Sequence, residues 1–152
     1  MRRRDREIVD RSEIEDIIRR AKVCRIALCD GGQPYIVPVC FGNDRDRLYI
    51  HSAPAGRKLD IIRRHPRVCF EMEIDVELVP ADAACGWGIR YRSVVGFGRA
   101  SLVEDDEEKL RALRLLMRQY SEEEFDLGLD SSRDCAVVRI DIESLTGKRC
   151  AG

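Results

Sequence analysis

The chain has 152 residues, of which 44% are hydrophobic and 36% are charged, and its formal net charge is −1 at pH 7. This length suits one domain with one core, and the balanced charge gives no sign of a nucleic-acid partner. The Arg-rich start lacks the apolar run of a signal peptide, and no stretch approaches a membrane span. We expect a cytoplasmic protein without membrane or nucleic-acid partners, with residues 1–11 as a solvated arm and residues 12–152 as the folded domain.

Seven cysteines are spread along the chain, an odd number with no C-x-x-C pair, which speaks against a disulfide framework or a zinc knuckle. Most stand in apolar runs, so we expect small buried side chains in a reducing compartment. These cysteines are Cys24, Cys29, Cys40, Cys69, Cys85, Cys135 and Cys150.

A capping box opens the first predicted helix, residues 13–22, because the Ser12 hydroxyl and the Glu15 carboxylate can accept from its free N–H groups. Strands over residues 23–29 and 34–41 follow, joined by Asp30-Gly31-Gly32, whose glycines allow the positive φ of a tight hairpin. A turn at residues 42–46 then leads into a short strand over 47–51. The three strands form a meander.

The second half begins with a short helix over residues 56–64, ended by His65-Pro66. Strict alternation of apolar and polar residues then predicts a long strand over 67–79 with one buried face. Residues 80–89 form a loop or crossing segment. A further strand over 90–102 carries Gly96 and Gly98 on one face, where we expect the barrel wall to bend or backbone from elsewhere to come close.

An acidic opening at residues 104–108 favours a helix N-terminus, and an amphipathic helix follows. Residues 121–134 are polar and predicted as loop, before a last strand in which Val138, Ile140 and Ile142 alternate with charged residues. About six strands joined mostly as hairpins, with flanking helices, indicate a mainly β (β+α) fold, an antiparallel barrel with helices outside. The apolar stripe of the amphipathic helix is Leu110, Leu113, Met117 and Tyr120.

Motifs for catalysis by side chains alone are missing from the sequence: it has no nucleophile elbow, Walker loop, GxGxxG fingerprint or metal-spaced cluster. With only His51 and His65, a histidine-rich metal site is excluded. A bound organic cofactor would supply the missing chemistry.

Residues 51–58 leave a strand and enter a helix, which places the Ser52 hydroxyl, two cations and free backbone N–H groups close together. A phosphate monoester needs such groups, and cations at a helix N-terminus favour a compensating anion. The alternative is that Arg57 and Lys58 are merely solvated.

Pro38 interrupts a predicted strand, where proline is tolerated only at an edge or a bulge. Backbone groups around Val37 and Val39 would then be free to bond the edge of a flat heterocycle; the alternative is an ordinary sheet edge. Residues 85–96, which include the single Trp87, indicate an interface or a ligand wall. A buried tryptophan with surface arginines is the alternative there.

Taken in order, these segments resemble the pyridoxamine 5′-phosphate oxidase-like, FMN-binding split-barrel proteins, and among them the branch related to nitroimidazole-resistance reductases. The resemblance covers residues 12–148 and depends on the order and spacing of its blocks. The blocks are G-Q-P-Y-I-V-P-V at 32–39, L-Y-I-H-S-A at 48–53 running through G-R-K at 56–58 to P-R-V-C-F at 66–70, Y-R-S-V-V-G-F-G-R-A at 91–100, and L-T-G-K at 145–148.

This resemblance implies a six-stranded split barrel that forms a homodimer with two FMN sites at its interface. The chain ends soon after Lys148, without the C-terminal segment by which vitamin B6 oxidases hold their substrate phosphate, so we do not expect oxidation of pyridoxamine phosphate. By position, the residues lining the flavin ring are Val37, Pro38 and Val39; those beside the cofactor are His51 and Ser52; those holding its phosphate are Arg57 and Lys58; and those from the partner subunit or the pocket wall are Tyr91, Arg92 and Ser93.

Three functions stay open from the sequence. The first is an FMN-dependent oxidoreductase that passes a hydride to a small acceptor such as a nitro-aromatic compound, with His51 as proton donor or substrate contact. The second is a flavin-binding or flavin-sensing module without turnover. The third is the same barrel holding the deazaflavin F420 or haem, with His51 or His65 as the axial ligand of the haem.

Overall fold

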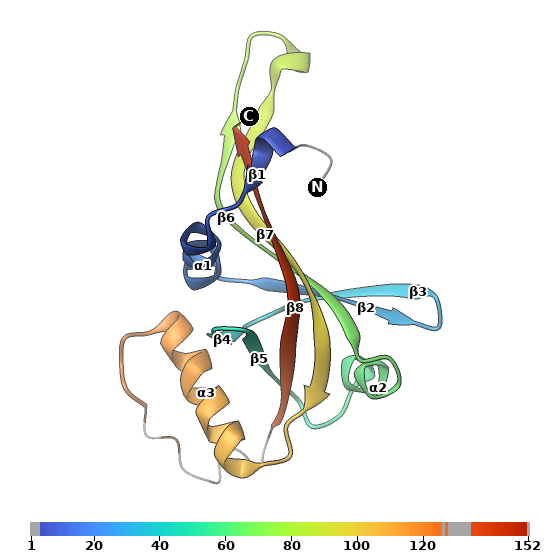
Figure 1. Ribbon diagram of the computed structural model, residues 1–152. Coiled ribbons are helices and arrows are strands. Elements are labelled where there is room, and N and C mark those ends of the chain that lie inside the picture. The colour runs from blue at the N-terminus through green and yellow to red at the C-terminus, as the bar shows by residue number, and fades with distance from the viewer. Residues whose placement is uncertain (1–3, 126, 128–134, 152) are drawn as a thin grey trace.

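The computed structural model describes residues 4–125, 127 and 135–151 (Figure 1). The helices are α1 (Arg11–Arg20), α2 (Arg57–Arg64) and α3 (Asp106–Tyr120). The strands are β1 (Glu7–Ile8), β2 (Cys24–Asp30), β3 (Gln33–Val39), β4 (Gly42–Asp44), β5 (Arg47–Ser52), β6 (Arg67–Val79), β7 (Gly88–Leu102) and β8 (Ala136–Ala151). Short 3-10 turns span Arg4–Arg6 and Ala84–Gly86.

One antiparallel sheet in the order β3-β2-β6-β7-β8-β5-β4 contains the strands, and β1 pairs with β8 at its side. The mainly β class with flanking helices is confirmed, while the described strands number eight rather than six. β6, β7 and β8 form the long curved centre of the molecule (Figure 1). No helix in the described part of the chain is long and apolar enough to cross a membrane.

Alternate side chains of the central strands face opposite sides. Ile26, Phe70 and Gly96 occupy opposed positions on the buried side, and Ala27, Cys69 and Phe97 occupy the next row, on the other side. We call the side that carries Ala27, Cys69 and Phe97 the outer face.

The close approach of backbone predicted at Gly96 and Gly98 is confirmed at Gly98, whereas the close neighbour of Gly96 is the side chain of Phe70. A Cβ atom added at Gly96 would lie 2.1 Å from the Phe70 ring, and one at Gly98 would lie 2.5 Å from the Asp141 carbonyl oxygen. The β7–β8 register shifts between Phe97 and Gly98, which is the predicted bend.

The predicted capping box is wrong. Helix α1 begins at Arg11, and the Asp10 carboxylate accepts from the Ser12 backbone N–H at 2.9 Å. Aspartate caps a helix as well as serine does, and the observed cap, Asp10, lies two residues before the predicted one, Ser12.

The folded domain also begins before residue 12. Glu7 and Ile8 pair with Lys148 and Gly147 of β8, and Ile8 is buried in the core. Residues 1–3 of the expected arm lie outside the described residues, as do residues 126 and 128–134 of the predicted loop.

The prediction of mostly buried cysteines is wrong. Only Cys24 and Cys150 are buried, while three cysteines are exposed and two are half-buried. Successive residues of a strand point to opposite faces, and here only one face is buried. A cysteine within an apolar run can therefore lie on either the buried or the exposed face. The exposed cysteines are Cys29, Cys40 and Cys85, and the half-buried ones are Cys69 and Cys135.

Candidate functional site

The turn between β5 and α2 places the predicted phosphate ligands at one helix end. β5 ends at Ser52, and α2 begins after Gly56, whose φ of +147° is a conformation that favours glycine. Gly56 has no side chain to cap the helix, so none satisfies the first backbone N–H groups. An anion is the natural ligand of such a helix end.

Lys58 lies in the first turn of α2 and is half-buried, yet its ammonium makes no hydrogen bond or ion pair with any described residue. Burial lowers the pKa of Lys58 from its ordinary value of 10.5. The positive end of the helix dipole disfavours this cation further. A bound phosphate would relieve both costs.

Arg57 stands beside Lys58 but is anchored by the β2–β3 hairpin. Its guanidinium carbon lies 4.7 Å from the centre of the Tyr35 ring, and its NH2 group lies 3.5 Å from an Asp30 carboxylate oxygen. Arg64, at the other end of α2, reaches the same carboxylate at 2.8 Å. Asp30 therefore fixes α2 against the hairpin, while about half of the Arg57 side chain stays exposed.

β3 is an edge strand, which explains its proline. It pairs along its whole length with β2, Val37 and Val39 included, and has no second partner strand among the described residues. The predicted local unpairing around Val37 and Val39 is therefore wrong, and the alternative, an ordinary sheet edge, is what the structure shows. Val37 and Val39 are half-buried on the side that carries Tyr35, while Pro38 points to the exposed side. The structure thus connects this strand to Arg57 through Tyr35.

His51 and Ser52 form the end of β5, opposite Val137 and Ala136 of β8. The His51 side chain is exposed and Ser52 is half-buried. Both precede the α2 turn directly, so the predicted group of His51, Ser52, Arg57 and Lys58 is contiguous in the fold.

Tyr91, Arg92 and Ser93 lie far from that group. Tyr91 is opposite Cys150 near one end of β8, whereas His51 is opposite Val137 near the other. β8 has 16 residues, and at about 3.3 Å per residue its ends are roughly 50 Å apart along the strand. Figure 1 shows this separation along β8. One chain does not bring the two groups together.

Arg92 is engaged by carboxylates of its own chain. Its guanidinium contacts Asp75 at 2.5 and 2.9 Å, Glu13 at 3.5 Å and Asp16 at 3.6 Å. The hydrogen bond from Arg92 is the main cause that lowers the pKa of Asp75. Of its neighbours, Ser93 is buried, and the Tyr91 hydroxyl accepts from the Lys148 ammonium at 2.8 Å.

Sequence reasoning missed Asp30 and Tyr35, which hold Arg57 in place. Tyr35 shares the period-two face of Val37 and Val39, and this signal could have placed it beside them. The sequence pattern places Asp30 in the hairpin turn and indicates no contact for it. Its contact with α2 joins segments far apart in the chain, which local patterns do not reveal.

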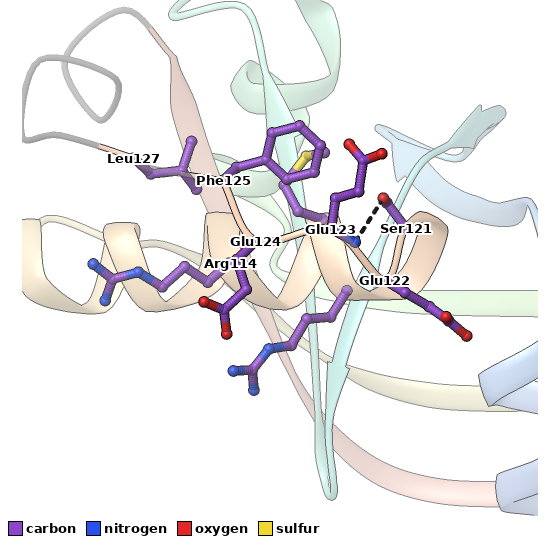
Figure 2. A pocket seen from close by; sticks show the side chains of 9 residues that line it. Arg114, Ser121, Glu122, Glu123, Glu124, Phe125 and Leu127 are labelled. Carbon is purple, nitrogen blue, oxygen red and sulfur yellow. Dashed lines mark hydrogen bonds between the residues drawn. The ribbon is translucent and has the colours of Figure 1, made fainter.

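A separate hollow of about 430 Å³ lies at the end of α3 and contains none of the predicted site residues. Figure 2 shows Arg114, Glu122 and Glu124 around it, with the Ser121 hydroxyl accepting from the Glu123 backbone N–H at 3.1 Å. Its lining is mixed in charge, and Phe125 is its aromatic side chain. This hollow gives no support to a flavin phosphate site.

The family model described as pyridoxamine 5′-phosphate oxidase matches residues 10–149, which is nearly the whole chain and includes every predicted site residue. The chain belongs to the pyridoxamine 5′-phosphate oxidase family. The family model therefore covers both groups of predicted site residues, including those that this chain keeps apart.

Solved structures agree with this membership. A proposed 5-nitroimidazole antibiotic resistance protein from Bacteroides thetaiotaomicron is 34% identical, with 94% of this chain and 86% of that chain covered and a TM-score of 0.84. A flavocytochrome from Azotobacter vinelandii is 24% identical, covering 100% and 72%, also with a TM-score of 0.84. An FAD- and haem-binding protein from Mycobacterium smegmatis is 20% identical, covering 97% and 74%, with the same score. The last two show the shared fold alone.

An uncharacterized protein from Rhizobium meliloti is 34% identical over 65 residues, which is 43% of this chain and 42% of that protein. The match therefore spans less than half of the relative's length.

Proposed function

We propose that the protein binds FMN and passes electrons from the reduced flavin to a small acceptor, such as a nitroimidazole or another nitro-aromatic compound. The observation that carries the proposal is the half-buried Lys58, which has no hydrogen-bond or ion-pair partner in the part of the chain that the structure describes, at the uncapped start of α2 within the family's matched region. Flavin and haem ligands named for structures of the same fold, together with the nitroimidazole-resistance relative, support the choice of cofactor and acceptor.

In this proposal, Lys58 and the first backbone N–H groups of α2 hold the FMN phosphate. Arg57 also contacts the phosphate, with the part of its guanidinium that Tyr35 and Asp30 leave exposed. A phosphate also accepts from a hydroxyl, and Ser52 is the nearest one along the chain. The flavin, when bound, supplies the hydride chemistry, and the protein supplies position and electrostatics.

The open edge of β3 would carry the flavin ring along Val37, Pro38 and Val39. Backbone groups on that edge have no strand partner among the described residues, so they can bond the polar edge of a flat heterocycle. His51, exposed at the end of β5, would face the acceptor and donate a proton or orient it.

We propose further that the site is completed in a homodimer by the segment 91–93 of the partner subunit. The separation of this segment from α2 within one chain supports the proposal. The half-buried Tyr91 would line the pocket, the buried Ser93 would support the segment from within its own chain, and Arg92 would hold the segment in place through Asp75 and α1.

The proposal is tested by the spectrum of the purified protein and by anaerobic redox assays. We expect flavin absorbance bands, reduction of the bound flavin by NADH or NADPH, and reoxidation by a nitro compound. A protein that is colourless and does not take up added FMN would contradict the cofactor. Flavin that binds but is neither reduced nor reoxidised would favour the sensing module, and mass spectrometry of the released ligand would separate FMN from F420 and haem.

A further inference from the structure

The direction of β3 sets the direction of the proposed ligand. Residues 37–39 are proposed to carry the flavin ring, and Tyr35, on the same face of the strand as Val37 and Val39, contacts Arg57, which is proposed to bind the phosphate. Toward its start the strand next reaches Gln33, which pairs with Asp30 across the hairpin turn. Any group attached beyond the phosphate would therefore extend toward Asp30.

Asp30 shares its carboxylate between two arginines of α2. One oxygen lies 3.5 Å from the Arg57 NH2 group, and the other accepts a hydrogen bond from Arg64 at 2.8 Å. These arginines stand about two turns of helix apart, so they lie on one face of α2. α2 lies beside the β2–β3 hairpin (Figure 1), and the Asp30 side chain is only 27% exposed. Water therefore screens the two contacts only in part.

FMN and FAD place different demands on such a site. Both carry a phosphate at the end of the ribityl chain, but FAD continues into a second phosphate with a negative charge of its own. The first phosphate is proposed to bind Lys58, the backbone N–H groups at the start of α2 and the exposed part of Arg57. The second would lie on the Asp30 side of Arg57, where a carboxylate repels it and the Arg64 guanidinium is already paired.

We propose that Asp30 makes this site selective for FMN over FAD. Its carboxylate pairs with Arg57 and Arg64, the cations that a second phosphate would need, and places a negative charge where that phosphate would lie. The inference rests on the proposed function and names the residue that sets the choice of flavin. Specificity of this kind comes from an unfavourable contact with the wrong ligand as well as from favourable contacts with the right one.

Titration of the full chain with FMN and with FAD tests the inference. We expect the wild type to bind FMN roughly tenfold or more tightly than FAD, the size of one charge-assisted hydrogen bond. In Asp30→Asn the FAD dissociation constant should fall by about tenfold, because a second phosphate then meets two guanidinium groups and no carboxylate. The FMN dissociation constant should fall less, since its single phosphate does not extend to Arg64. Damage to the hairpin would weaken both ligands, so a gain for FAD separates selectivity from folding.

Two further variants locate the effect. Asp60→Asn removes a carboxylate from the same helix, where Asp60 pairs with Arg63 at 3.0 Å, and should leave the ratio of the two dissociation constants unchanged. Adding Arg64→Gln to Asp30→Asn should abolish the gain for FAD, because Arg64 is a group that the first substitution frees.

The same titrations distinguish failure of the inference from failure of the proposed function. A wild type that binds FAD as tightly as FMN would overturn the inference, whatever the variants do. An Asp30→Asn protein with the wild-type ratio would also overturn it, and in both cases the proposed phosphate site at the start of α2 would stand. A wild type that binds neither flavin would instead contradict the proposed function, and the selectivity of Asp30 with it.

Discussion

Lys58 and Arg92 were both predicted to bind the cofactor, yet the structure gives them opposite surroundings. Arg92 has three carboxylate groups within 3.6 Å, from α1 and from the β6 bulge at Asp75, where the β6–β7 register shifts between Ile74 and Glu77. Lys58 has no partner among the described residues and lies at the positive end of α2. A cation that is already neutralised stabilises the fold, whereas an unpaired and partly buried cation is available to a ligand.

This comparison predicts that removing the Lys58 charge affects the ligand most. A charge-assisted hydrogen bond contributes about 1.5–3 kcal/mol, so Lys58→Ala should raise the dissociation constant of FMN by roughly 10- to 100-fold with little loss of stability. Isothermal titration measures the affinity. Arg63→Ala on the same helix, where Arg63 pairs with Asp60, is the matched control and should bind FMN normally.

Arg92→Ala should instead weaken the fold. It removes contacts to Asp75, Glu13 and Asp16, and we expect the free energy of unfolding to fall by about 1–2 kcal/mol, as for a hydrogen-bonded network of charges. Urea denaturation measures the change. Arg19→Ala, which loses only an exposed pair with Asp16, should cost under about 0.5 kcal/mol. Normal stability combined with a large loss of FMN affinity would reverse the assignment of Arg92.

The lowered pKa of Lys58 predicts a pH dependence of binding. As pH rises, Lys58 loses its proton before an ordinary lysine, so FMN affinity should weaken through the alkaline range below 10.5. Without ligand the sign for stability is opposite: the unfolded lysine still holds its proton there, so unfolding becomes less favourable as pH rises through the folded pKa. An affinity profile of Lys58→Ala that follows the wild type would show that another group titrates.

The cysteines allow the same comparison of buried and exposed groups by chemical labelling of the native protein, without a substitution. Burial raises the pKa of Cys24 to about 12, so its thiol should resist alkylation at pH 8 in the native protein. Exposed Cys29, Cys40 and Cys85 should react readily with iodoacetamide, as peptide mapping can show. Rapid labelling of Cys24 would mean that the region around β2 opens easily.

Patterns within short segments predicted the elements that depend on those segments alone, such as a strand with alternating apolar residues. Alternation predicted the bounds of β6, Arg67–Val79, and Pro38 limited its strand to an edge or a bulge, of which the structure shows an edge. The full length of β8 was not predicted, because its second half is set by pairing with β7 and lacks strict alternation. The short β1 likewise depends on β8.

The candidate site was predictable to the same extent. The residues from His51 to Lys58 were predicted to lie on one strand–turn–helix segment, and the structure has that segment as the end of β5, a turn and the start of α2. Contacts between segments far apart in the chain were not predictable. These are the ion pair of Arg57 with Asp30, and the contacts of Arg92 with α1 and with Asp75 of β6. A residue's type and spacing indicate a possible ligand, but the surrounding charges decide whether it is free.

Comparison of FMN with riboflavin tests the central claim most directly, because the two ligands differ only in the phosphate. Their dissociation constants are measured for the wild type and for Lys58→Ala. We predict that the wild type binds FMN at least tenfold more tightly than riboflavin and that this preference is largely lost in Lys58→Ala, with riboflavin affinity unchanged. Equal affinities for both ligands in the wild type, or a preference that survives in Lys58→Ala, would contradict a phosphate site at the start of α2.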